Sequence, residues 1–201
     1  GLIGQNDAVE YGMINPTTMQ YWTPAGNINV DFGPTLEEWT HVAVIVNADG
    51  MHVYANGEQI GTAGGGGAVN SAFNFNMGGS GVYDGTGNWF LGSIDDVAVW
   101  NIALSEDQIA ALAAQQIFPI ARYNPLHEGM IAYYDFDSDS EIEDGTVTDS
   151  VAGMEGVVNG SGVTATDGQF GSAIDFGTEA LDTSVTIEYV NDWLAPASDA
   201  D

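Results

Sequence analysis

The sequence predicts an all-β sandwich of two antiparallel sheets with one short helix near residues 105 to 115. Apolar runs of period two recur along the chain and are separated by Gly, Pro, Asn and Asp, the pattern of short strands joined by turns. One run differs: Leu104-Ser105-Glu106-Asp107-Gln108 places a Ser N-cap before two acids, which is typical of a helix start. With 44% hydrophobic and 10% aromatic residues, the 201-residue chain can bury a packed core.

The expected strands of the first half are joined by recognisable turns. They lie at residues 8–12, 19–22, 28–32, 39–47, 51–55 and 73–77. In the fourth of these strands, Val42, Val44 and Val46 share one face. Ala48-Asp49-Gly50 is expected to form a tight hairpin turn and Asn56-Gly57 a type I′ turn, so the strands on either side should pair antiparallel.

Charge is the most unusual property of the chain. It has 29 Asp and Glu against one basic residue, Arg122, for a formal net charge of -28. Such a surface repels phosphate and anionic lipid, so neither nucleic acid nor a membrane surface is an expected partner. The self-repulsion requires screening by salt or by bound cations, which indicates a saline exterior and a divalent metal.

The sequence also lacks cysteine, a long apolar segment and a basic N-terminal region. The chain has no Cys, so disulfides are excluded. It has no apolar run of about 18 residues and no basic N-terminal region, so neither a membrane span nor a signal peptide is expected.

Three motifs in order resemble a known family. They are Glu38-Trp39-Thr40-His41-Val42-Ala43, then Asp49-Gly50 with Asn56-Gly57, then Gly92-Ser93-Ile94-Asp95-Asp96-Val97 followed by Asn101-Ile102-Ala103-Leu104-Ser105. Together they resemble the closing part of a laminin G-like domain of the concanavalin A-like lectin/glucanase superfamily. The resemblance implies a concanavalin A-like jelly-roll sandwich.

The second part of the chain resembles the opening part of the same domain. Its motifs are Ala132-Tyr133-Tyr134-Asp135-Phe136-Asp137, Asp149-Ser150-Val151-Ala152-Gly153 and Gly171-Ser172-Ala173-Ile174-Asp175-Phe176. Residues 1–122 are therefore interpreted as a closing part, 123–128 as a connector and 129–201 as an opening part, in the reverse of the family order. The chain is either a window across two tandem domains or a circular permutant.

Both interpretations share a physical constraint. Half a sandwich leaves an apolar face and unpaired strand edges, which the other half or a neighbouring chain must cover. If neighbouring copies cover one another in this way, the contact does not close, and the chain is a structural subunit of a head-to-tail extracellular filament.

The acids suggest a calcium site. The resemblance implies that Asp149 lies in a loop that often holds calcium, that Asp95 and Asp96 lie on the strand beside this loop, and that Asp135 and Asp137 flank the opening strand. Carboxylates are the ligands that calcium prefers. The run from residue 135 to 146 is not an EF-hand, because its sixth position is Ser140 and its twelfth is Thr146; a looser calcium loop stays open.

Aromatic residues suggest a second kind of site. Tyr21, Trp22, Tyr83 and Trp89 lie in or next to expected loops, where exposed rings would form a platform for a glycan or cell-surface polysaccharide. A glucanase would instead need two acids on one strand face, and the nearest match, Glu141-Ile142-Glu143, lies in turn-like sequence. The sequence thus favours a non-catalytic extracellular or cell-surface adhesion or carbohydrate-binding module stabilised by calcium, with the filament subunit and a glycan-degrading hydrolase as alternatives.

Overall fold

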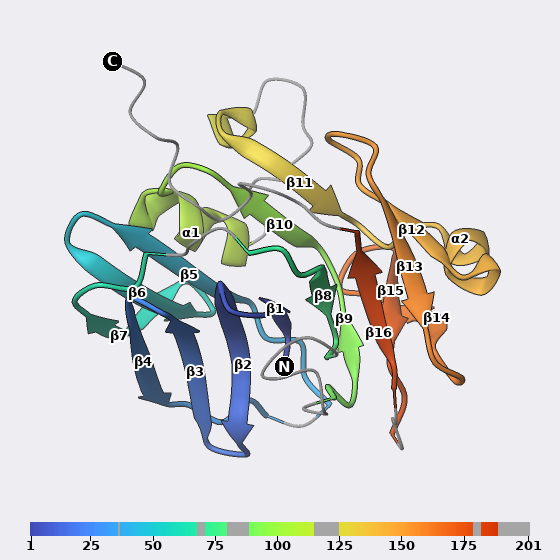
Figure 1. Cartoon of the computed structure of the whole chain (residues 1–201), viewed down its shortest axis with the longest axis horizontal. Coiled ribbons are helices and arrows are strands. Elements are labelled where there is room, and N and C mark those ends of the chain that lie inside the picture. Colours follow the sequence, from blue (N-terminus) through green and yellow to red (C-terminus); the bar gives the residue numbers. More distant parts are fainter. Residues whose placement is uncertain (36, 68–70, 80–88, 115–124, 179–181, 189–201) are drawn as a thin grey trace.

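The computed structural model describes residues 1–35, 37–67, 71–79, 89–114, 125–178 and 182–188. Strands are the predominant regular structure of this part, and all of its strand pairs are antiparallel (Figure 1). The predicted all-β class and the sandwich of antiparallel sheets are confirmed.

One sheet runs through most of the molecule. Its eight strands lie in the order β12 (Thr146–Thr148), β13 (Glu155–Asn159), β16 (Ser184–Ile187), β8 (Phe75–Met77), β1 (Ile3–Gln5), β2 (Val9–Asn15), β3 (Thr18–Thr23) and β4 (Gly26–Asp31).

Three smaller sheets accompany it. They are β10 (Val97–Trp100) with β11 (Met130–Tyr134); β14 (Thr164–Asp167), β15 (Ser172–Asp175) and β9 (Ser93–Ile94); and β5 (Val42–Asn47), β6 (Gly50–Ala55) and β7 (Glu58–Ala63).

Local sequence explains the turns. Asn56 and Gly57 both have positive φ, 48° and 82°, as the predicted type I′ turn between β6 and β7 requires. Asn47 and Gly50 pair directly across the two-residue turn between β5 and β6, again as predicted.

Two helices flank the sheets, of which the sequence predicted one. Helix α1 (Glu106–Ala113) begins at the predicted N-cap: Ser105 accepts the Gln108 N–H at 3.2 Å, and the Gln108 side chain accepts the Ser105 N–H at 2.8 Å. Helix α2 (Asp139–Asp144) was expected as a turn or a loose calcium loop. It forms because Ile142 is buried in the core and Gly145 ends the helix with a φ of 87°.

The predicted closing and opening parts share sheets and core. β11 pairs with β10, β15 with β9 and β16 with β8, so β8, β9 and β10 join the blue and orange strands in the middle of Figure 1. Phe75 and Met77 pack in one cluster with Tyr134, Val185 and Ile187. The two parts therefore cover each other's apolar faces within one chain.

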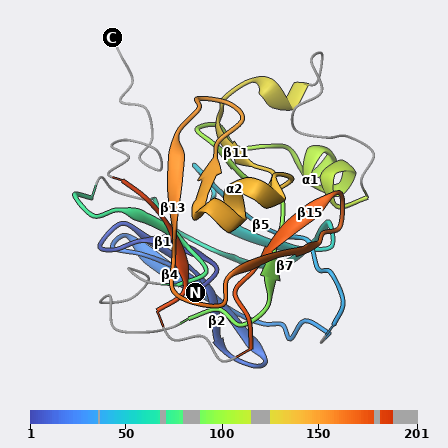
Figure 2. The same cartoon turned by 90° about the vertical axis from the view of Figure 1, so that its right-hand side faces the viewer.

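The view in Figure 2 places α2 at one end of the molecule, between β13 and β15. A short 3-10 helix, η1 (Pro125–His127), precedes β11. None of the described helices has the length and hydrophobicity needed to cross a bilayer.

Candidate functional site: an acidic cluster and a polar sheet face

Four of the five predicted calcium ligands lie near one another: Asp95, Asp96 and Asp135 lie near the hydroxyl of Tyr133, and Asp137 lies near Asp96. Asp95 and Asp96 link β9 to β10, whereas Asp135 and Asp137 follow β11 directly. The pairing of β10 with β11 brings the two acidic pairs together, and the phenol of Tyr133 donates a hydrogen bond to Asp96 Oδ1. Within the described residues, no three Asp, Glu or His side chains are arranged to hold a metal ion.

Asp95 is held by a loop from the second part of the chain. Its Oδ2 accepts the backbone N–H groups of Gln169 at 2.8 Å and Phe170 at 3.4 Å, while its buried Oδ1 has no hydrogen-bond partner among the described residues. Burial, and to a lesser extent repulsion from Asp96, raises the pKa of Asp95 to about 7. The hydrogen bonds from the backbone act in the opposite direction but are outweighed. This carboxyl is therefore half-protonated near neutral pH.

Asp96 shares this environment. Burial raises its pKa, and the negative charges of Asp137 and Asp135 add to this, whereas the hydrogen bond from Tyr133 works in the opposite direction. Asp96 also has a φ of 53°, an uncommon conformation for a residue other than glycine. Burial and the contact with Asp96 raise the pKa of the Tyr133 hydroxyl, so it stays a neutral donor.

Asp135 and Asp137 fix neighbouring loops. Asp135 Oδ2 accepts the Ser150 hydroxyl at 2.8 Å, and Asp137 Oδ1 accepts the Ser172 N–H at 2.9 Å. A Cβ at Gly171 would collide with the Asp137 carboxylate, so glycine is required for this contact. Both acids thus combine structural hydrogen bonds with a negative charge facing Asp96.

Asp149, the fifth predicted ligand, has a different environment. It is 1% exposed, and both of its carboxylate oxygens accept backbone N–H groups: Oδ1 those of Tyr133 at 2.7 Å and Val151 at 2.9 Å, and Oδ2 that of Ala152 at 2.7 Å. These bonds tie the turn after β12 to β11. The observed role of Asp149 is therefore to fix this turn.

The predicted aromatic platform is divided between the two faces of the eight-stranded sheet. Tyr21 was expected in or next to a loop but lies within β3 and is only 7% exposed, with its ring edge against Tyr11 at a centroid distance of 6.3 Å. This expectation was wrong because β3 continues to Thr23, so Tyr21 takes an inward position of the strand. Trp22 is half-buried and points outward; Trp89 packs on the backbone of Gly79; Tyr83 lies outside the described residues.

Trp22 belongs to a row of outward positions that the sequence did not reveal. The strand register aligns this row across seven strands, in the order Val157, Thr186, Asn76, Gly4, Glu10, Trp22 and Asn27. Within it, Asn76 and Glu10 are buried. Next to it, Gln20 Nε2 donates to Asn29 Oδ1 at 2.7 Å, and the Thr186 hydroxyl donates to Asn76 Oδ1 at 2.9 Å. We call the outward face of these strands the polar sheet face. The alternation of polar and apolar residues in β3 could have indicated that Trp22 points outward. The row itself could not be predicted, because it depends on pairing between strands that are far apart in the sequence.

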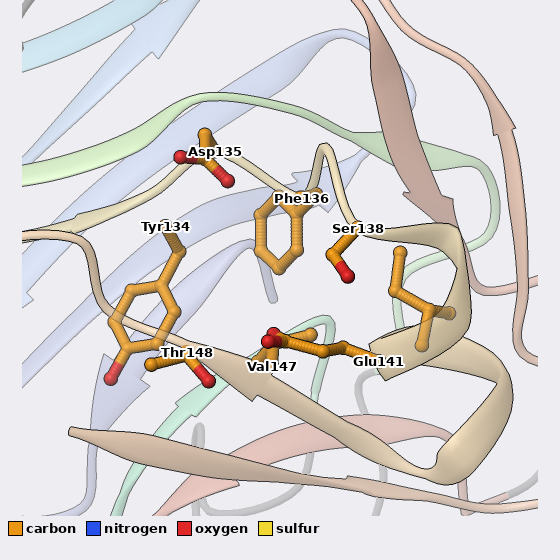
Figure 3. A pocket seen from close by; sticks show the side chains of 8 residues that line it. Tyr134, Asp135, Phe136, Ser138, Glu141, Val147 and Thr148 are labelled. Atoms are coloured by element: carbon orange, nitrogen blue, oxygen red, sulfur yellow. The ribbon is translucent and has the colours of Figure 1, made fainter. Parts of the chain in front are cut away.

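The carboxylate pair considered for a glucanase does not share a strand face. Glu141 and Glu143 lie on α2, where residues two apart point in different directions. Figure 3 shows the small cavity beside this helix, with Glu141 at its edge and Tyr134, Phe136 and Val147 around it. Its volume is about 10 Å³, which is room for one water molecule and not for a sugar ring.

Comparison with known families gives one match. The family described as "Concanavalin A-like lectin/glucanases superfamily" matches residues 2–110, just over half of the chain. This range lies within the part predicted to be the closing half. Comparisons with curated proteins and with solved structures give no match.

Proposed function

Because the chain belongs to the concanavalin A-like lectin/glucanase superfamily, as its laminin G-like motifs predicted, we propose that it is a non-catalytic extracellular module that binds a glycan. The observation that carries this proposal is the polar sheet face, where half-buried Trp22 stands beside exposed Asn27 through the strand register. Aromatic rings that stack on a sugar, beside amides and carboxylates that bond its hydroxyls, are the usual elements of a carbohydrate site.

The amide side chains beside Trp22 support this proposal. Gln20 is half-buried, Asn29 is exposed, and the two are bonded to each other, so each keeps further donor and acceptor capacity for sugar hydroxyls. The face is part of a continuous sheet, and its side chains are held on rigid strands rather than on loops. A pre-organised surface of this kind loses little entropy on binding.

The negative net charge of the chain limits which class of glycan can bind. At -28, the chain repels sulfated and uronate-rich polysaccharides, and the effect is strongest at low ionic strength. We therefore expect a neutral glycan, such as a β-glucan or a xylan, rather than an anionic one.

The acidic cluster supports calcium as a stabilising ligand of the same module. Asp95, Asp96 and Asp135 lie near the Tyr133 hydroxyl and Asp137 lies near Asp96. As placed in the described part of the chain they do not form a ligand set, so calcium binding requires their side chains to turn toward one ion. Calcium is bound by oxygen ligands of this kind and would offset their mutual repulsion.

The experiment is a binding screen against neutral and anionic polysaccharides, followed by calorimetry on the best ligand. Trp22→Ala is expected to weaken binding by about five- to 150-fold, since stacking of one ligand ring on an aromatic side chain contributes on the order of 1–3 kcal/mol. Trp39→Ala is the matched control: Trp39 is 41% exposed but lies outside the polar sheet face, so its loss should leave binding unchanged. Absence of binding to every neutral polysaccharide would remove the glycan from the proposal.

The same samples test the hydrolase alternative. A non-catalytic module releases no reducing sugar from the ligand that it binds, even over days. Release that disappears in Glu141→Gln or Glu143→Gln would instead establish the glucanase alternative.

A further inference from the structure

A strand-sized gap separates two sheets that lie in one layer of the sandwich. β5 pairs only with β6, and β10 pairs only with β11, among the described strands. The edges of β5 and β10 border a common cavity, which is lined by the continuous segments 37–48 and 90–104. Helix α1 closes it on one side with Ile109 and Leu112, and the inward face of β2 and β3 closes it on the other with Tyr11, Met19 and Tyr21.

The size of the cavity fits one added strand. Its volume is about 1320 Å³. A six-residue strand in a packed sheet occupies about 1000 Å³, from ~4.8 Å between strands, ~10 Å between layers and ~20 Å of length.

The edge of β5 offers hydrogen bonds to this gap. The bond from Asn56 N to His41 O, together with the register of β5 with β6, shows that residues 41, 43, 45 and 47 bond to β6. The backbone N–H and C=O groups of Val42, Val44 and Val46 therefore point away from β6 and toward the gap.

The edge of β10 also offers backbone hydrogen-bonding groups to the gap, from the opposite side. Tyr133 stands opposite Ala98, but its N–H donates to Asp149 and its C=O accepts from Ser150 N, so this pair exchanges no backbone hydrogen bonds. The backbone groups of Ala98 consequently point away from β11, into the gap.

The sequences of both strands are those of central strands. Natural edge strands are protected by charges, prolines or bulges that stop further pairing. β5 reads Val-Ala-Val-Ile-Val-Asn and β10 reads Val-Ala-Val-Trp, with no charge and no proline. Their side chains are apolar on both faces, which is the pattern of strands paired on both sides.

We propose that the gap binds an extended peptide segment of a partner protein, which adds one strand between β5 and β10. The peptide has apolar side chains on both faces, because the cavity is closed by α1 on one side and by the large sheet on the other. It carries basic residues at its ends, because Glu37, Glu38, Asp95, Asp96 and Asp167 line the same cavity. A second copy of this chain is the disfavoured occupant, since each copy has a net charge of -28.

The test uses a synthetic peptide with six central apolar residues and two lysines at each end. We expect one peptide to bind per chain by calorimetry, and binding to weaken at least tenfold when alternate peptide amides are N-methylated, since methylation removes the strand-pairing donors. These peptide changes leave the protein unaltered, so the comparison holds even if a protein variant does not fold.

A pair of proline variants tests the site on the protein. Val44→Pro removes an N–H that faces the gap without breaking a bond to β6, and it should weaken peptide binding at least tenfold. Thr62→Pro is the matched control: the register of β6 with β7 points its N–H away from β6, at the outer edge of the same small sheet, so peptide binding should be unchanged. Circular dichroism confirms that both variants are folded.

Three results would overturn the proposal. The first is failure of the lysine-flanked peptide to bind. The second is equal binding of the N-methylated peptide, which would indicate an apolar ligand pocket. The third is self-association in sedimentation experiments that Val44→Pro abolishes, which would identify a second copy of the chain as the occupant.

Discussion

The carboxylate of Asp149 accepts the backbone N–H of Tyr133 at 2.7 Å, which connects the turn after β12 to the middle of β11. The same side chain also bonds the N–H groups of Val151 and Ala152. One acid thereby positions the strand that carries Tyr133 and leads into Asp135 and Asp137. The acidic cluster depends on this buried contact.

Replacement of this carboxylate should destabilise the fold. In Asp149→Asn an amide NH2 replaces one acceptor oxygen, so a buried backbone N–H loses its partner and the remaining bonds lose the charge. We expect the free energy of unfolding to fall by about 3 kcal/mol in urea denaturation. Asp49→Asn, in an exposed turn, is the control and should change it by no more than about 0.5 kcal/mol. Equal stability of the two variants would contradict the role given to Asp149.

Asp95 should make stability depend on pH. Burial and Asp96 raise its pKa from 3.8 to about 7 in the folded state, so between these values the folded chain holds a proton that the unfolded chain has released. Its contribution to stability is complete below pH 3.8 and is lost as the pH rises through 7. In a calcium-free buffer, Asp95→Asn should therefore melt at a higher temperature than the wild type at pH 8, with the difference shrinking toward pH 4. A difference that grows toward acid pH would contradict this sign.

Calcium should reverse the effect of the same variant. At a hundredfold excess over its Kd, a ligand that binds only the folded chain stabilises it by about 2.7 kcal/mol, or roughly 5–10 °C in Tm for a domain of this size. Chelation of the wild type should therefore lower the Tm by this amount, and Asp95→Asn should lose most of the gain. Magnesium is the control cation, since it requires a more regular octahedral site. Superimposable melting curves with calcium and with chelator would remove calcium from the proposed function.

The contribution of the α1 N-cap to stability can be measured by comparing substitutions at the N-caps of α1 and α2. Ser105 bonds Gln108 N, so Ser105→Ala should cost about 1 kcal/mol of stability. Ser138 occupies the same position before α2 but makes no capping bond, and Ser138→Ala should therefore be nearly neutral. Similar losses in both variants would show that helix propensity, and not the capping box, accounts for the effect at Ser105.

Local signals in the sequence predicted much of the fold. The Asn56-Gly57 turn and the Ser105 cap are determined by residues within a few positions of one another, and both form as expected. Helix α2 was missed because Asp139, Ser140 and Asp144 have low helix propensity; the burial of Ile142 by tertiary contacts outweighs this tendency. Tyr21 was misplaced because the end of a strand is set by pairing with its neighbours.

The candidate sites were less accessible from sequence. Asp95 and Asp137 were identified as acids of one site, but the loop that holds Asp95 lies 74 residues away in the chain. The row from Val157 to Asn27 exists only through the register of seven strands. Such non-local juxtaposition leaves no periodic signal in the sequence.

The position of β8 between β1 and β16 also has a consequence for biosynthesis. Its Asn76 bonds to Thr186, 110 residues later, so this seam cannot form while a ribosome is still translating the intervening segment. Until then, Phe75 and Met77 lack one of their flanking strands, and the nascent polypeptide is vulnerable to misassembly and proteases. The strand pairing at the centre of the large sheet is therefore completed last, and not first, during synthesis.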